Sequence, residues 1–155
     1  MIVDGPEAVL LDLLNTTPVV DDRPTDVLTG EWLRAHGASG HRLADVRRLR
    51  DDLQRVVRGD GPAEVLQPYL EGVTQAPAIV DGAVEWRLGA DWAARVVLAW
   101  GELQAGMPGR LRPCANGECH LFLLDRSRAG TARWCSMEVC GNRMKARRHY
   151  GRAKG

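Results

Sequence analysis

The chain lacks the long apolar run that a membrane-spanning helix requires. Its opening residues, MIVDGPEAVL, also lack the basic segment, apolar core and small-residue cleavage site of a secretory signal. Hydrophobic residues make up 45% of the 155 residues and charged residues 26%, which is typical of a soluble globular protein. We therefore expect a cytoplasmic protein that does not bind a membrane.

Side chains suited to catalysis are scarce as well. Residues 1–109 contain two histidines, His36 and His41, and no Ser/His/Asp spacing, paired-cysteine nucleophile or phosphate-binding glycine loop. An active site needs a nucleophile, an acid or base, or an electrophilic group held in such a constellation. We therefore expect a protein that is not an enzyme.

Cysteine is absent before residue 114, and all four cysteines fall in the last third of the chain. They form two pairs, Cys114 with Cys119 and Cys135 with Cys140, and each pair encloses four residues. Two short loops that each present two thiolates favour a single tetrahedral zinc ion. Four thiolates leave no open position for water, so the spacing predicts one structural Zn²⁺ held by all four cysteines.

Two other uses of these cysteines remain open from the spacing. They could form a disulfide pair, which needs an oxidising compartment, or they could be ordinary buried cysteines. A thioredoxin-like redox motif has two residues between its cysteines, whereas each pair here encloses four. His120, which follows Cys119, is the nearest rival as a metal ligand.

Charge is divided unevenly along the chain. Residues 1–109 carry 10 basic and 17 acidic side chains, a net charge of −7, whereas residues 110–155 carry 11 basic and 3 acidic side chains, a net charge of +8. At this boundary, residues 104–114 (QAGMPGRLRPC) contain the glycines and prolines typical of a linker. We therefore predict an α+β protein of two domains, a mainly helical one over 1–105 and a basic zinc-binding one over 110–155.

Apolar residues recur at spacings of three and four in several segments of the first domain. The clearest case is residues 41–59, where Leu43, Val46 and Leu49 begin an apolar stripe and charged residues occupy the opposite face. Further helices are expected over residues 6–17, 26–37, 62–72 and 91–104.

Residues 78–88 read differently, because apolar and polar residues alternate there around Asp81-Gly82, which suits a type I′ turn. This pattern predicts a short β-hairpin. The first domain also holds four tryptophans, which we expect to lie in its core or to line a pocket for a small effector. They are Trp32, Trp86, Trp92 and Trp100.

The cysteine-rich segment has its own predicted order of elements. Residues 120–125 are expected to form a strand, 126–130 a turn and 131–134 a returning strand. Ser136 is then placed to cap a helix that runs to about Tyr150. A ligand loop, a hairpin and a ligand-bearing helix together predict a treble-clef-like zinc finger.

The stretch WCSMEVCGNRMKARRH (134–149) resembles the signature of the CGNR zinc-finger family, and the resemblance extends over residues 111–150. Upstream, LLDLLNT (10–16) and LTGEWLRAHG (28–37) resemble the ABATE domain that usually precedes this finger. The resemblance implies that the four cysteines bind zinc and that the protein is a stress-induced transcription regulator whose finger contacts DNA.

Polar and basic side chains of the second domain are candidates for binding nucleic acid, most simply double-stranded DNA. Their concentration on so small a module is the electrostatic feature expected of a phosphate-backbone binder. The candidates are Arg126, Arg128, Arg133, Asn142, Arg143, Lys145, Arg147, Arg148 and Arg152. For Arg143 and Arg147, hydrogen bonds to the thiolates or to the first domain are an alternative role.

We therefore expect a zinc-dependent nucleic-acid-binding protein that regulates transcription in a stress response. The first domain would sense a signal, bind a small effector or form a homodimer. The opposite net charges of the two domains keep a second hypothesis open, in which the finger is a structural module that docks onto another protein or onto its own acidic domain.

Overall fold

The structure is a computed structural model that describes residues 5–154. Residues 1–4 and 155, at the outer ends of the two predicted domains, lie outside the described residues. In chain order the elements are α1 (Pro6–Leu14), β1 (Val19–Val20), β2 (Arg23–Pro24), α2 (Gly30–Ala35), α3 (Leu43–Arg58), η1 (Ala63–Leu70), β3 (Thr74–Val80), β4 (Ala83–Gly89), α4 (Trp92–Gly106), β5 (Leu111–Pro113), β6 (Phe122–Leu124), η2 (Met137–Gly141) and α5 (Asn142–Ala153). Helices combined with small antiparallel sheets confirm the α+β prediction.

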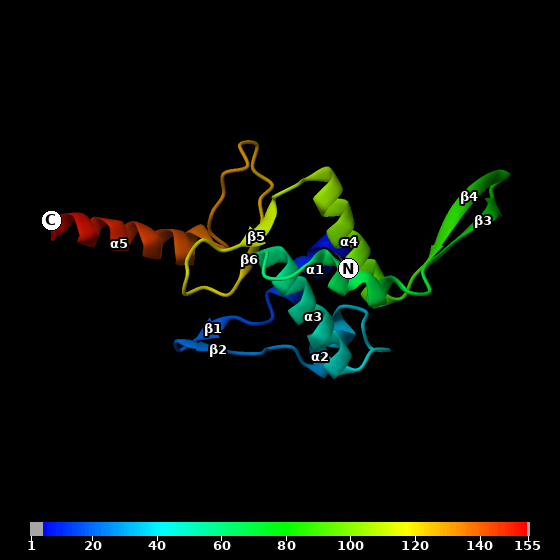
Figure 1. Cartoon of the computed structure of the whole chain (residues 1–155), viewed down its shortest axis with the longest axis horizontal. Helices are drawn as coiled ribbons and strands as arrows, with labels where there is room; N and C mark the ends of the chain where they lie inside the picture. The colour runs from blue at the N-terminus through cyan, green and yellow to red at the C-terminus, as the bar shows by residue number, and fades with distance from the viewer. Residues whose placement is uncertain (1–4, 155) are drawn as a thin grey trace.

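The core lies between α1, α3 and α4, which lie together at the centre of the molecule (Figure 1). Each of these helices buries one apolar stripe against the others. Leu10 and Leu13 come from α1, Leu49 and Leu53 from α3, and Val97 from α4, and all five are buried. Burial of this apolar surface is the main force that holds together the segment from α1 to α4, called the helical part below.

The predicted helix over 41–59 is present as α3 and ends at Gly59, whose positive φ of 78° closes the helix in the left-handed region. The last helix of the first domain is present as α4. It begins after Asp91, whose carboxylate accepts a hydrogen bond of 2.8 Å from the Ala94 N–H. Here the local sequence signals and the tertiary fold agree.

Three other helices differ from their predicted bounds. α1 ends at Leu14 rather than residue 17, and Asn15 follows it. α2 begins at Gly30 rather than residue 26, because the Thr29 hydroxyl caps it by accepting from the Trp32 N–H at 3.2 Å. The element after Pro62 is a 3-10 helix, η1, and not an α-helix. Pro68 lies inside it and has no N–H to donate to an α-helical ladder.

A buried arginine ties residues 15–28 to α3. Arg50 is only 4% exposed, and its Nη1 donates to Asp26 Oδ1 at 2.8 Å and to Thr16 Oγ1 at 3.3 Å. Burial raises the pKa of Asp26, but the hydrogen bond and charge of Arg50 outweigh it and leave that pKa below its ordinary value. A buried guanidinium needs such partners, so this pair fixes the path of the chain between α1 and α2.

The predicted β-hairpin is present as β3 and β4, which pair antiparallel from Val80 opposite Ala83 down to Thr74 opposite Gly89. Asp81 and Gly82 both have positive φ, 48° and 79°, as a type I′ turn requires. The hairpin projects away from the helices (Figure 1).

One of the four tryptophans does not lie in the core, contrary to the prediction. Trp86 on β4 is 66% exposed. The other three, Trp32, Trp92 and Trp100, are partly buried and pack against the core as predicted. The alternating pattern identified the apolar face of the hairpin correctly, and that face is exposed along β4.

The linker interpretation of residues 104–114 is wrong over its last part. Residues 111–113 form β5, which pairs antiparallel with β6 in the register Leu111 opposite Leu124 and Pro113 opposite Phe122. Leu111 and Phe122 are 5% and 1% exposed, and both belong to the same core as α1 and α3. The division of the chain into domains over 1–105 and 110–155 remains a prediction. Leu111 and Phe122 belong to the second predicted domain but pack in the core of the first.

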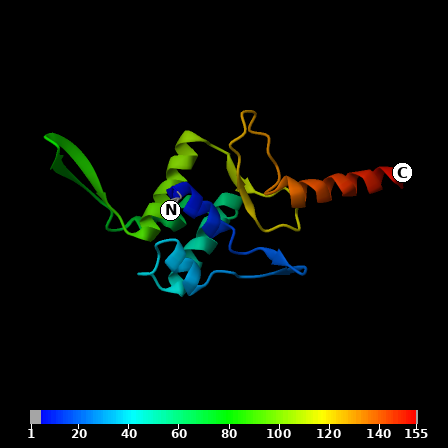
Figure 2. The same ribbon diagram turned by 180° about the vertical axis from the view of Figure 1, so that it is seen from behind.

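Seen from behind, the hairpin and α5 extend from opposite ends of the molecule (Figure 2). Between residues 5 and 154, no helix combines the length and the apolar character needed to cross a membrane.

Candidate metal centre and basic helix

The four cysteine sulfurs form one compact group, and every pair of Sγ atoms lies within 4.8 Å. Cys135 Sγ lies 3.6 Å from Cys119 Sγ and 3.7 Å from Cys140 Sγ. All four cysteines are free, so no pair is joined as a disulfide. Zinc–sulfur bonds of about 2.3 Å in a tetrahedron put the sulfurs about 3.8 Å apart, so the four thiols fit one structural zinc ion.

Each cysteine comes from a different short segment. Cys114 follows β5, Cys119 closes the turn that begins at Asn116, Cys135 precedes η2, and Cys140 lies within η2. The predicted rival ligand, His120, lies outside the cluster, which among the described residues consists of the cysteines alone. The β5–β6 pair and the start of α5 therefore bring both cysteine pairs to one point.

Two N–H groups point at the sulfurs. The Cys135 N–H donates to Cys114 Sγ at 3.4 Å, and the side-chain amide of Asn116 donates to Cys140 Sγ at 3.5 Å. Asn116 is 1% exposed, and its Oδ1 accepts from the Glu118 N–H. Such groups orient ligands and stabilise thiolate charge. The spacing of the cysteines does not identify Asn116 as a site residue, although its position inside the first cysteine pair is a signal for such a role.

The thiols differ in acidity. Burial raises the pKa of Cys119 to about 11 and raises the pKa of Cys135 still further. Burial also acts to raise the pKa of Cys140, but the hydrogen bond from Asn116 and the neighbouring thiols outweigh it, and that pKa lies below its ordinary value. Zinc binds thiolates, so each thiol that is protonated without the metal releases its proton when the ion binds, and zinc affinity should rise with pH.

The helix that carries Cys140 begins as predicted at Ser136, whose hydroxyl accepts from the Val139 N–H at 3.4 Å. Its first turn, η2, is a π-helical turn that continues into α5. A Cβ on Gly141 would lie 2.7 Å from Met137 Sδ and 3.2 Å from Trp134 Cδ1. A larger residue at this position would therefore displace the end of the Met137 side chain, which is 53% exposed.

The predicted returning strand over residues 131–134 is not formed. Instead Asp125, whose side chain is fully buried, accepts hydrogen bonds from the Ser127 N–H and hydroxyl and from the Ala132 N–H, and pairs with Arg112. The Ser127 hydroxyl is the largest cause of the lowered pKa of Asp125. Residues 125–132 therefore form a loop gathered around a carboxylate, and the strand partner of β6 is β5.

The basic side chains of α5 fall into two groups. Lys145, Arg148 and Arg152 are exposed, and within residues 5–154 no acidic side chain pairs with any of them. Arg147 donates instead to Glu118 Oε2 at 2.6 Å. Arg143 lines a hollow beside Cys140, opposite the turn between β1 and β2.

The remaining candidates lie apart from that helix face. Arg126 donates to Glu7 Oε1 of α1 at 2.8 Å, and the Arg133 guanidinium lies over the Trp134 ring at 5.1 Å. Asn142 donates to the Glu138 carbonyl at 3.3 Å. Arg128 is exposed. The structure thus brings the four metal candidates together but distributes the nine nucleic-acid candidates over a helix and a loop.

A site closed by four thiols, built on a two-stranded sheet and the first turn of a helix, defines a structural zinc finger. In agreement, residues 110–153 match the CGNR zinc finger family. The match covers the finger and not the helical part of the chain. No curated protein matches this chain.

Proposed function

We propose that the protein is a zinc-stabilised DNA-binding regulator whose finger binds the phosphate backbone through α5. The observation that carries this proposal is the exposed row of Lys145, Arg148 and Arg152, which has no acidic partner in the described part of the chain. These residues follow one another at spacings of three and four, so they share one face of the helix. Five of the twelve residues of α5 are basic and none is acidic.

The position of α5 supports the same proposal. None of its residues is buried, and the helix extends away from the rest of the molecule (Figure 1). An isolated helix of this length is marginally stable in water, because little packing offsets its conformational entropy. The major groove of DNA admits an α-helix, and phosphates on both sides would neutralise its charge.

The zinc ion is structural in this proposal and not catalytic. Four thiolates would hold it, and it would supply folding free energy to the finger, which buries few large apolar side chains of its own. The role in a stress response and the ABATE domain rest on the sequence resemblance described above, and the treble-clef arrangement rests on the order of elements predicted for the finger.

A gel-shift titration of the full chain with genomic duplex fragments at several salt concentrations tests DNA binding. We expect the logarithm of the affinity to fall linearly with the logarithm of salt, by about 0.9 for each phosphate contact. Failure to bind duplex DNA at low salt would contradict the proposal. Preferential binding to single-stranded RNA would mean that RNA, and not DNA, is the nucleic acid that the finger binds.

One set of contacts favours the second hypothesis, in which the finger docks onto its own helical part. Arg126 pairs with Glu7, and the Arg58 guanidinium of α3 donates to the His120 carbonyl at 3.0 Å and lies over the Phe122 ring. These contacts involve the loop and β6 and leave the exposed row of α5 free. Docking through β6 and DNA binding through α5 are therefore compatible.

A further inference from the structure

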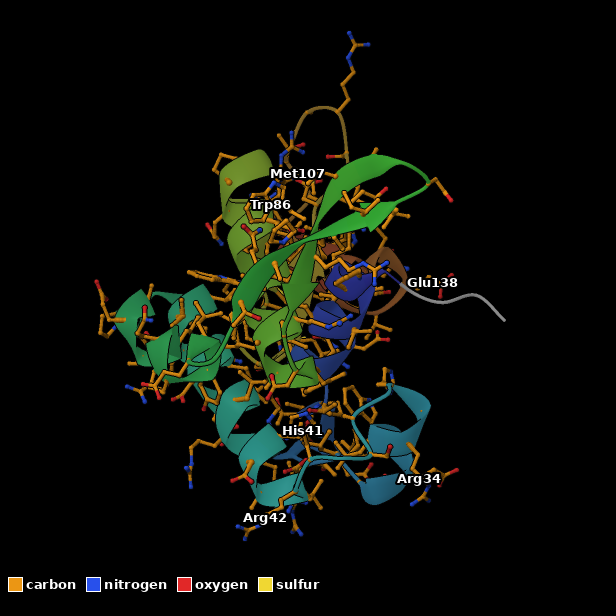
Figure 3. All side chains as sticks on the ribbon, turned by 90° about the vertical axis from the view of Figure 1, so that its right-hand side faces the viewer. Arg34, His41, Arg42, Trp86, Met107 and Glu138 are labelled. Atoms are coloured by element: carbon orange, nitrogen blue, oxygen red, sulfur yellow. The ribbon has the colours of Figure 1, made fainter. Side chains whose placement is uncertain are left out.

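Strand β4 is exposed along its whole length, which is unusual for seven residues that include a tryptophan. Over residues 5–154 its one strand neighbour is β3. A two-stranded hairpin alone is at best marginally stable in water and gains stability from a third strand or a covering helix. Within the described residues no third strand pairs with this hairpin. Figure 3 shows the hairpin facing the viewer, with Trp86 labelled on it.

The two edges of the hairpin are not equivalent. Val80 and Ala83 flank a two-residue turn, so they form a hydrogen-bonded pair, and the pairs alternate from there. Pro77 opposite Trp86 is therefore a non-hydrogen-bonded pair, whose backbone groups point away from the partner strand. Pro77 has no N–H, so it blocks further pairing along β3. The N–H and C=O of Trp86 lie on the open edge of β4.

The two faces of β4 differ as well. Val84, Trp86 and Leu88 point to one face and are 63%, 66% and 44% exposed. Glu85 and Arg87 point to the other face, where they lie opposite Ala78 and Ala76 of β3. Along the strand the residue types are therefore apolar, acidic, Trp, basic and apolar. A second β4 that runs antiparallel places its basic residue opposite the acidic one and its apolar residues opposite the apolar ones.

We propose that β4 pairs antiparallel with β4 of a second copy of this chain, about a two-fold axis that passes beside Trp86. This register places Glu85 opposite Arg87 of the second copy and Arg87 opposite its Glu85. Val84 then lies opposite Leu88 of the second copy, and the two Trp86 side chains become neighbours on the apolar face. Cross-strand pairs of these kinds stabilise a sheet, whereas like charges in the same positions destabilise it.

Charge complementarity of the strand with itself is what identifies a second copy as the occupant, rather than an unrelated protein. Pairing of the two β4 edges gives a four-stranded antiparallel sheet whose outer edges are both β3 strands. Because Pro77 blocks those edges, the assembly closes at two copies and does not extend into a fibre. The hairpin and α5 extend from opposite ends of the molecule, so both basic helices stay free in the dimer (Figure 2).

Charge reversal and its rescue test this register directly. The dissociation constant of the dimer is measured by sedimentation equilibrium of the full chain over a concentration series, without DNA. Glu85→Arg and Arg87→Glu should each raise it about tenfold or more, because each places like charges opposite one another at two symmetry-related positions. The double variant Glu85→Arg/Arg87→Glu restores two opposite-charge pairs and should return the constant to within about threefold of wild type.

Glu64→Arg, which reverses an exposed carboxylate on η1, is the matched control and should leave the constant unchanged. Circular dichroism and zinc content should be alike in all variants, because both charged side chains face alanines within the hairpin. A wild-type chain that stays monomeric over the whole series overturns the proposal. So does a double variant as weakly dimeric as the single ones. Neither readout involves DNA, so failure of this proposal and failure of DNA binding are separate results.

Discussion

Asn15, the residue after α1, pairs through its side-chain amide with both backbone groups of Phe122 in β6. Its Oδ1 accepts from the Phe122 N–H at 2.8 Å, and its Nδ2 donates to the Phe122 carbonyl at 3.2 Å. The amide thereby takes the place of a neighbouring strand on the free edge of β6. One side chain from the helical part thus completes the sheet of the finger, 107 residues along the chain.

Replacement of this side chain should destabilise the whole chain. Asn15→Ala leaves the N–H and C=O of Phe122 without partners in a buried place, so we expect the free energy of unfolding to fall by about 2–3 kcal/mol. Urea titration followed by circular dichroism measures it. Gln67→Ala, which removes an exposed amide on η1, is the matched control and should change the value by about 0.5 kcal/mol or less. Equal effects of the two variants would show that the Asn15–Phe122 pairing is dispensable.

Zinc should be present at about one ion per chain, which metal analysis of the purified protein checks. Cys140→Ser removes one ligand, so the variant should lose the ion and its amides over residues 114–150 should lose protection in hydrogen exchange. Ser136→Ala, which removes only the cap of η2, should keep the ion. A zinc-free protein whose residues 114–150 remain protected would contradict the structural role of the metal.

Replacement of Lys145, Arg148 and Arg152 together by alanine separates DNA binding from docking. Each lost phosphate contact removes about 0.9 from the slope of log affinity against log salt, so the slope should flatten by about 2.7 and binding should weaken for every sequence alike. The melting temperature should barely move, since exposed charges without partners contribute little to stability.

The matched control for that variant replaces three exposed arginines of α2, α3 and the loop between them by alanine. They are Arg34, Arg42 and Arg48 (Figure 3 labels the first two). This control should keep the full salt slope. A Lys145/Arg148/Arg152 variant with a lower melting temperature and the full salt slope would mean that α5 docks onto the rest of its own chain.

Asp125→Asn should loosen the loop over residues 125–132. The pKa of Asp125 lies below its usual range, chiefly because of the Ser127 hydroxyl, so its carboxylate stabilises the folded state above the unfolded pKa of about 3.9. That contribution is lost as the pH falls through the folded pKa. The difference in melting temperature between wild type and variant should therefore be constant from about pH 8 to pH 5 and should narrow below about pH 4. Glu102→Gln, an exposed carboxylate on α4, should show no such difference.

The sequence predicted the elements whose signals are local. Their spacing alone predicted that the four cysteines share one site, because two short loops with paired thiolates have few other uses. The structure confirms this for Cys114, Cys119, Cys135 and Cys140. Asp81-Gly82 fixed the turn of the hairpin, since few other residue pairs tolerate two positive φ angles.

The features that the sequence did not predict depend on distant partners. β5 is three residues long and ends in a proline, so it carries no periodic signal, and only its pairing with β6 makes it a strand. Pro113 is tolerated because Phe122 turns its N–H and C=O to Asn15 and not to β5. Alternation in β4 showed which side chains share a face, but exposure of Trp86 depends on whether another element covers that face.

Leu111 and Phe122, buried in the core of α1 and α3, link zinc supply to the stability of the helical part. A ligand that binds only the folded state adds RT ln(1 + [L]/Kd) to the free energy of unfolding, about 2.7 kcal/mol when free zinc is about 100 times Kd. Because the finger and the helices share these side chains, part of that energy reaches the helices. Scarcity of the ion would raise the population of unfolded chains open to proteolysis, so the abundance of this protein should follow the availability of zinc.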